Sequence, residues 1–201
     1  MSKVHYHFDH VGSYLRPQAL KEAREKFADG DISQDELLKV QDELVKDLVH
    51  HEVENGLQVV SDGEFGRSWW HLDFLWNLTG FEAYQQEDSY KFHGAKTRTT
   101  NVRINGKIAE NPNHPFYRDF EYLKSVTPEG ITPKVTIPSP SLIINRDHRS
   151  DLYADYYDSW TDFLDDLAKA YHDTIQHFYD LGARYVQLDD TTWGLSLIHI
   201  S

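Results

Sequence analysis

Four short apolar segments, each ending in small or acidic residues, constrain the fold of this chain more than any other feature. They cover residues 4–13, 57–62, 133–141 and 183–190, and at least one predicted helix separates each from the next. Apolar strands that alternate with helices are typical of a parallel sheet. The sequence therefore predicts an α/β fold with four parallel strands.

The intervening helices have clear boundaries. SQDE forms a capping box, because the Ser33 side chain can bond the Glu36 amide while Glu36 reaches back to Ser33. The segment TNVRINGKIAE, residues 100–110, predicts a β-hairpin insert, since Asn105-Gly106 suits a type I′ turn. Helices are expected at 18–30, 33–55, 114–126 and 151–181.

Residues that could take part in catalysis or ligand binding follow the strands. In a (β/α)₈ TIM barrel the carboxyl ends of the strands carry the active site, and a doubly wound sheet also binds ligands there. A complete barrel needs about 250 residues, so four strands are about half of one. We therefore expect the first half of a TIM barrel, with these residues at its rim: Gly12, Ser13, Asp62, Gly63, Glu64, Ser139, Asp189 and Asp190.

The last residues do not continue this pattern. A loop and an amphipathic helix are expected after Gly194, but residues 195–201 read LSLIHIS. These seven residues can be back-translated into the transposon mosaic-end adapter used in preparing sequencing libraries. We therefore expect residues 1–194 to be the N-terminal part of the barrel and residues 195–201 to be a non-native tail.

Composition excludes several classes of partner and site. The net charge of −13 disfavours a nucleic-acid partner, because an acidic surface repels phosphates. The chain lacks both an apolar run of about 18 residues and the apolar stretch of a signal peptide, so we expect a cytoplasmic protein without a membrane partner. It also lacks cysteine, which excludes disulfides and thiolate metal ligands from this sequence.

The acids allow several chemical roles. Carboxylates that converge on one rim can bind an ammonium group, act as acid and base, or hold a metal. Each Asp could also be a helix cap. Glu64 lies between Gly63 and Gly66, which makes it a poor cap. Gly12-Ser13 forms a small turn whose backbone amides could hold a carboxylate.

Other residues are weaker candidates for lining the site. His10, His71, Ser139, Asp190 and Trp193 lie near the predicted rim, and packing explains them equally well. Alternating histidines near the start of the chain could chelate zinc, but only His10 is close to the rim. We therefore predict no metal site from these histidines.

Four motifs together resemble a known family. HVGSYLRP, GLQVVSDGEFGR, KVTIPSPS and YVQLDDTTWG occur in this order between residues 5 and 194. This set resembles the cobalamin-independent methionine synthase superfamily. It is most similar to the short, single-barrel bacterial branch, which resembles the C-terminal catalytic domain of that enzyme.

The resemblance implies an activity and roles for individual residues. It implies transfer of a methyl group, usually from methyltetrahydrofolate, to the thiol of homocysteine, with zinc keeping the sulfur as a thiolate. Val11, Gly12 and Ser13 would contact the amino-acid portion of homocysteine. Glu64 and Asp189 would bind its ammonium group.

This sequence departs from the family pattern in two ways. The zinc ligands of the family lie on later strands, so we expect no metal ligand here and an inactive isolated chain. Pro140 stands where the full-length synthases carry a folate-stacking Trp. The acceptor could therefore be another thiol, such as coenzyme M. The remaining alternative is a TIM-barrel hydrolase, such as a glycosidase, which uses paired carboxylates about 5–10 Å apart.

Overall fold

The computed structural model describes residues 9–85, 91–92, 95–96, 99–145 and 153–191. Its contacts divide the chain into two compact units. The first unit comprises residues 1–70, 115–136 and 178–187, and the second comprises 71–114, 137–177 and 188–201.

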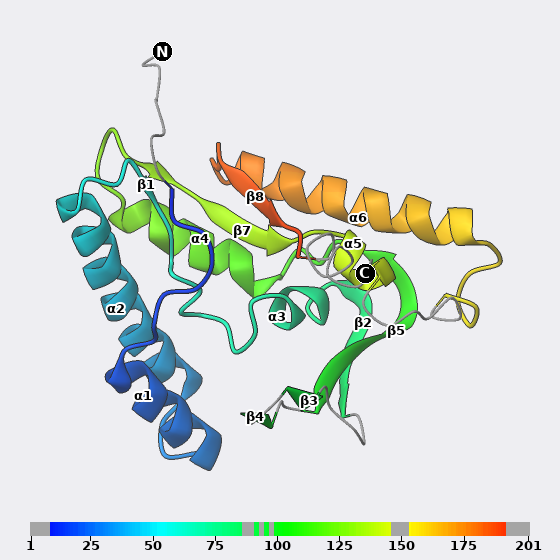
Figure 1. The fold of residues 1–201 in the computed structure, drawn as a ribbon, viewed down its shortest axis with the longest axis horizontal. Helices are drawn as coiled ribbons and strands as arrows, with labels where there is room; N and C mark the ends of the chain where they lie inside the picture. Colours follow the sequence, from blue (N-terminus) through cyan, green and yellow to red (C-terminus); the bar gives the residue numbers. More distant parts are fainter. Residues whose placement is uncertain (1–8, 86–90, 93–94, 97–98, 146–152, 192–201) are drawn as a thin grey trace. The chain divides into compact units, whose positions relative to one another are not determined.

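Two helices open the first unit. Helices α1 (Gln18–Asp29) and α2 (Gln34–Glu54) pack against each other (Figure 1). The capping box of Ser33 and Glu36 is confirmed, and both of its hydrogen bonds are present at the start of α2. Gly30 ends α1 in the left-handed conformation that glycine adopts readily.

A short parallel pair and a third helix complete the core of this unit. Strand β1 (Val59–Val60) pairs in parallel with β6 (Thr132–Pro133), and α4 (Pro115–Val126) contacts both α2 and β6. Removing these apolar side chains from water supplies the main stabilisation. The buried core consists of Leu20, Val45, Val49, Val60, Phe65 and Leu123.

The second unit contains an antiparallel ribbon. Strand β2 (Thr79–Gln85) pairs with β5 (Thr100–Ala109), and a register shift lies next to Gly80 (Figure 1). The predicted turn at Asn105-Gly106 is wrong, because these residues lie inside β5. The hairpin signal was local, whereas the partner strand lies about twenty residues earlier in the chain. A further antiparallel pair joins β3 (Lys91–Phe92) to β4 (Ala95–Lys96).

Three helices belong wholly or mainly to this second unit. They are α3 (Leu72–Leu75), α5 (Ser141–Asn145) and α6 (Trp160–Asp180). The long helix predicted from residue 151 therefore begins later, since residues 153–159 form turns and Ser159 caps the helix by accepting from the Asp162 amide at 3.1 Å. Tyr171, on the buried face of α6, donates to the carbonyl of Pro138 at 2.9 Å.

Strands β7 (Val135–Pro138) and β8 (Val186–Asp189) form a second parallel pair. Val135 N donates to Tyr185 O at 3.2 Å, and Ser139 N donates to Asp189 O at 2.8 Å. The residue numbers of the two strands therefore increase in the same direction, as parallel pairing requires. The predicted α/β class and parallel pairing are confirmed. Barrel closure stays a prediction. Residues 4–8 of the strand predicted at 4–13 lie outside the described residues, and the prediction is wrong for residues 9–13, which form a loop.

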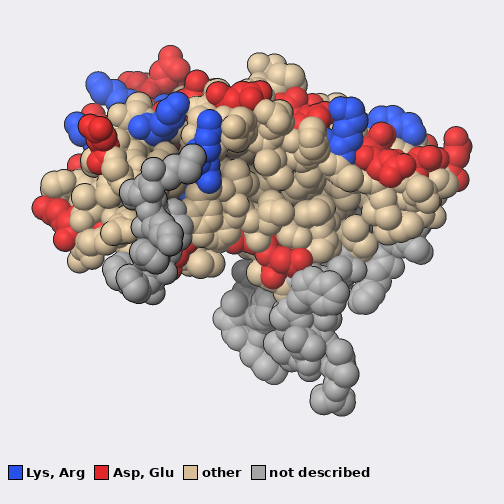
Figure 2. Space-filling view, turned by 90° about the horizontal axis from the view of Figure 1, so that it is seen from above, with Lys and Arg blue, Asp and Glu red and all other residues tan. Residues whose placement is uncertain are grey.

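Figure 2 shows one face of the molecule, on which acidic side chains are interspersed with basic ones.

Candidate functional site

The loop after β1 has an unusual backbone. Gly63 and Glu64 both have positive φ, at 63° and 60°, and Glu64 is the one described non-glycine residue with this feature. The Glu64 amide donates to Oδ1 of Asp62 at 2.9 Å, which supports the turn. A left-handed Glu costs about 1–2 kcal/mol, and such strain is concentrated at functional sites. The strained backbone of this loop therefore fixes the position of Glu64, and it lowers the stability of the fold.

The loop containing Gly12 and Ser13 meets this strained residue. The Ser13 hydroxyl donates to Oε2 of Glu64, and the Tyr14 amide donates to the Gly63 carbonyl at 3.2 Å. Gly12, with φ at 87°, provides the turn, while Val11 is exposed. Three of the predicted residues, Gly12, Ser13 and Glu64, thus lie together in the first unit.

Arginines surround the loop that carries Glu64. Nη1 of Arg67 lies 3.4 Å from Oε1 of Glu64, and both side chains are almost fully buried. Arg16 and Arg24 donate instead to backbone carbonyls, Arg16 to Arg67 O at 2.8 Å and Arg24 to Phe65 O at 2.6 Å. A carboxylate has about four lone-pair sites for donors. With one long ion pair and one hydroxyl, Glu64 keeps capacity for a second cation.

A buried lysine fixes the other end of the Gly12 loop. Nζ of Lys134 donates to Oδ1 of Asp9 at 2.9 Å, to the carbonyl of His10, and to Gln187 at 3.1 Å. Burial of Asp9 tends to raise its pKa, but hydrogen bonds from Tyr185 and Lys134 outweigh this and lower the pKa below its ordinary value. Asp9 is therefore a structural anion that anchors the loop.

His10 packs within its own loop. Its ring stacks on Tyr14 with centroids 3.9 Å apart, and Nε2 lies 2.6 Å from the Gly12 carbonyl. These contacts match the packing interpretation of His10 rather than a metal-binding one.

Asp189 and Asp190 belong to the second unit. The Asp190 carboxylate accepts from the hydroxyls of Ser139 at 3.1 Å and Ser141 at 2.8 Å, so it orients the turn after β7. The Asp189 carbonyl accepts from the Ser139 amide. The proximity of Asp189 to Ser13 and Glu64 stays a prediction. Trp193 lies outside the described residues.

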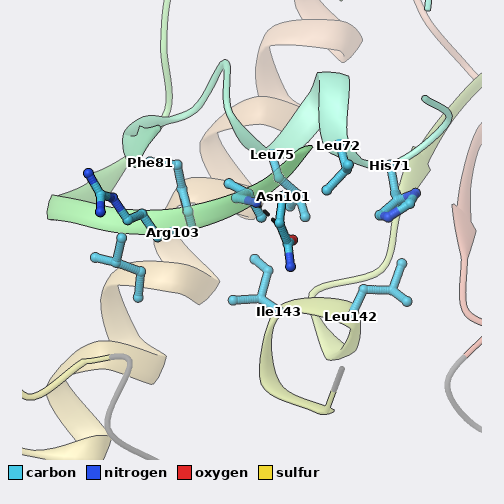
Figure 3. A pocket seen from close by; sticks show the side chains of 10 residues that line it. His71, Leu72, Leu75, Phe81, Asn101, Arg103, Leu142 and Ile143 are labelled. Carbon is cyan, nitrogen blue, oxygen red and sulfur yellow. Dashed lines mark hydrogen bonds between the residues drawn. The ribbon is translucent and has the colours of Figure 1, made fainter. Parts of the chain in front are cut away.

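The second unit also contains a small hollow that is open to solvent. Figure 3 shows His71 beside Leu142 at this hollow, across from Ile143 and the side chain of Asn101. Its wall is mainly apolar. It is lined by His71, Leu72, Leu75, Phe81, Asn101, Val102, Arg103, Ile104, Leu142 and Ile143.

The described residues do not make a metal site. Among them, no three or more His, Cys, Asp or Glu side chains are grouped to hold a metal ion, and the sequence has no cysteine. Within the same part of the chain, every helix is too short or too polar to cross a bilayer.

The sequence reasoning missed one buried acid. Glu52 of α2 is 3% exposed, and its Oε2 accepts from the Ser61 amide at 3.1 Å. Burial raises its pKa to about 7, and the charge of Asp62 acts in the same direction. A signal was available, because Glu52 continues the helical spacing of the buried Val45 and Val49. An acid within an apolar stripe needs buried polar partners.

Comparison with known proteins places these features in a family. Residues 9–197 match the model of the cobalamin-independent synthase catalytic domain. YxjH of Bacillus subtilis, a protein of uncharacterised function, is 39% identical over 96% of this chain and 50% of its own length. The methionine synthase of Sulfolobus acidocaldarius is 29% identical over 95% of this chain and 56% of its own.

Solved structures agree with this assignment. A Listeria monocytogenes protein, assigned provisionally as a vitamin-B12 independent methionine synthase, is 40% identical and superposes with a TM-score of 0.75. The match covers 93% of this chain and 52% of that one. The chain thus spans about half the length of the relatives it matches. On this evidence, the chain belongs to the cobalamin-independent methionine synthase family.

Proposed function

We propose that the chain supplies the amino-acid-binding part of a methyltransferase that converts homocysteine to methionine. The contact between the Ser13 hydroxyl and the buried, left-handed Glu64 carries this proposal. A fixed carboxylate with spare acceptor capacity suits an ammonium group, and a turn rich in backbone amides suits a carboxylate. A free amino acid carries both groups.

Each residue has a stated role. Glu64 would bind the ammonium, while Gly12 and Ser13, together with Val11, would contact the rest of the amino-acid portion. Arg67, whose Nη1 lies 3.4 Å from Oε1 of Glu64, keeps the Glu64 carboxylate in place. Holding the substrate in one orientation favours in-line attack of its sulfur on a methyl group. The reaction forms the sulfur–methyl bond and breaks the methyl–nitrogen bond of the donor, which takes up a proton.

Zinc and the methyl donor are further parts of the proposal. Zinc would keep the homocysteine sulfur as a thiolate, with ligands outside the described residues. Methyltetrahydrofolate is the donor that the family suggests. Membership of this family supports a methyl-transfer reaction rather than hydrolysis. We place this reaction in the cytoplasm.

Calorimetric titration of the chain with L-homocysteine tests the proposal. We expect saturable binding of L-homocysteine. We expect much weaker binding of coenzyme M, a thiol that has a sulfonate and lacks the ammonium group. Binding of coenzyme M with no binding of L-homocysteine would instead favour another thiol acceptor.

A further inference from the structure

A buried carboxylate lies behind the two loops that bring Ser13 and Glu64 together. Glu52 comes from the last turn of α2, which ends at Glu54. Its Oε2 accepts from the Ser61 amide at 3.1 Å, and its Oε1 accepts from the Ser61 hydroxyl at 3.3 Å. Glu52 therefore fixes the first residue of the loop that leads to Glu64.

The same carboxylate reaches the other loop through Tyr14. Burial raises the pKa of Tyr14 to about 12, and the nearby charge of the Glu52 carboxylate acts in the same direction. The Tyr14 amide donates to the Gly63 carbonyl at 3.2 Å. Tyr14 directly follows Ser13, and Gly63 directly precedes Glu64. The bond between Tyr14 and Gly63 therefore joins the direct neighbours of Ser13 and Glu64.

Stability alone does not explain an acid at this position. Glu52 continues the buried stripe of Val45 and Val49 and is itself 3% exposed. Burying an ionisable group costs free energy, and a well-packed apolar side chain often serves a core better. The acid does something that an apolar residue cannot, which is to accept from the amide and the hydroxyl of Ser61 while its charge lies beside Tyr14.

We infer that Glu52 is a positioning residue, which acts through Tyr14 and Ser61 to hold Ser13 against Glu64 in the geometry that binds an amino acid. This inference rests on the proposed function. It adds a residue from outside the site whose contacts determine the shape of the site.

The test compares Glu52→Ala, Glu52→Gln and Val49→Ala in the whole chain. Val49 is 1% exposed on the same helix face, so Val49→Ala perturbs the core without removing a side-chain hydrogen bond to either loop. Calorimetry with L-methionine as the probe measures affinity. The amide resonances of Ser13 and Glu64 report local geometry by nuclear magnetic resonance.

We expect Glu52→Ala to raise the dissociation constant for L-methionine about tenfold, the effect of losing one or two hydrogen bonds. The amide resonances of Ser13 and Glu64 should shift in the same variant. Glu52→Gln keeps a carbonyl acceptor and should restore most of the affinity. Val49→Ala should lower the unfolding temperature without either effect.

Unchanged affinity and unchanged resonances in folded Glu52→Ala would overturn the inference, as would an equal loss in Val49→Ala. If the wild-type chain does not bind L-methionine, the proposed function fails and the resonances alone decide the inference. If Glu52→Ala does not fold, Tyr14→Phe replaces it, because this variant removes only the hydroxyl. Resonances of Ser13 and Glu64 that stay in place in Tyr14→Phe would then overturn the inference.

Discussion

Replacing Glu52 with Gln should change how the stability of the protein depends on pH. Burial raises the pKa of Glu52 to about 7 from an ordinary value of 4.5. The folded state therefore binds this proton more tightly than the unfolded state, and the free energy of unfolding falls as pH rises from about 4.5 to 7. At about 1.4 kcal/mol per pH unit, the wild type should lose about 3 kcal/mol through this group. Gln cannot ionise and avoids this loss.

Urea denaturation of both chains between pH 4.5 and 8 measures the effect. The free energy of unfolding of Glu52→Gln minus that of the wild type should increase by about 3 kcal/mol across this range. Other titrating groups act in both chains and cancel in the difference. Glu43→Gln, at an exposed position of the same helix, is the matched control and should show a much smaller change. If the difference between the two free energies of unfolding stays constant with pH, the argument that burial raises the pKa of Glu52 is refuted.

Three further substitutions test other parts of the fold. In thermal unfolding, Gly63→Ala should destabilise the chain by about 1–3 kcal/mol more than Gly56→Ala. A Cβ at Gly63 would meet Leu48 at 2.5 Å, whereas a Cβ at Gly56 would have nothing within 4 Å. Equal losses of stability in the two variants would contradict this. Burial and the nearby negative charge of Asp62 raise the pKa of Asp119 to about 6, so Asp119→Asn should gain stability relative to the wild type between about pH 4 and 6. An opposite trend in urea denaturation would show that the carboxylate is preferred in the folded state. Ser33→Ala removes a capping box and should cost about 1 kcal/mol by the same assay; no change would mean that the cap does not contribute.

Local signals in the sequence were sufficient for several elements. The capping box at Ser33 and the glycine at the end of α1 depend on neighbouring residues alone, and both are present. The parallel pairing also followed from apolar segments separated by helices. The hairpin prediction failed at Asn105-Gly106 because a strand can contain a turn-forming dipeptide when a distant segment pairs with it.

The site was only partly predictable, for a related reason. Glu64 was noticeable because glycines flank it, and Ser13 because it follows a glycine. Lys134 acts through Asp9, which lies 125 residues earlier in the chain, and Arg67 also donates to the carbonyl of Thr136, 69 residues later. Such pairings depend on the tertiary fold, so motif spacing alone does not indicate them.

The central claim is that Glu64 holds the ammonium group of an amino-acid ligand. The most direct measurement compares the binding of L-homocysteine with that of its analogue in which a hydroxyl replaces the amino group, in the wild type and in Glu64→Gln. We predict that the wild type prefers L-homocysteine by about tenfold or more. Glu64→Gln should lose most of this preference while remaining folded by circular dichroism. The same preference in both chains would contradict the claim.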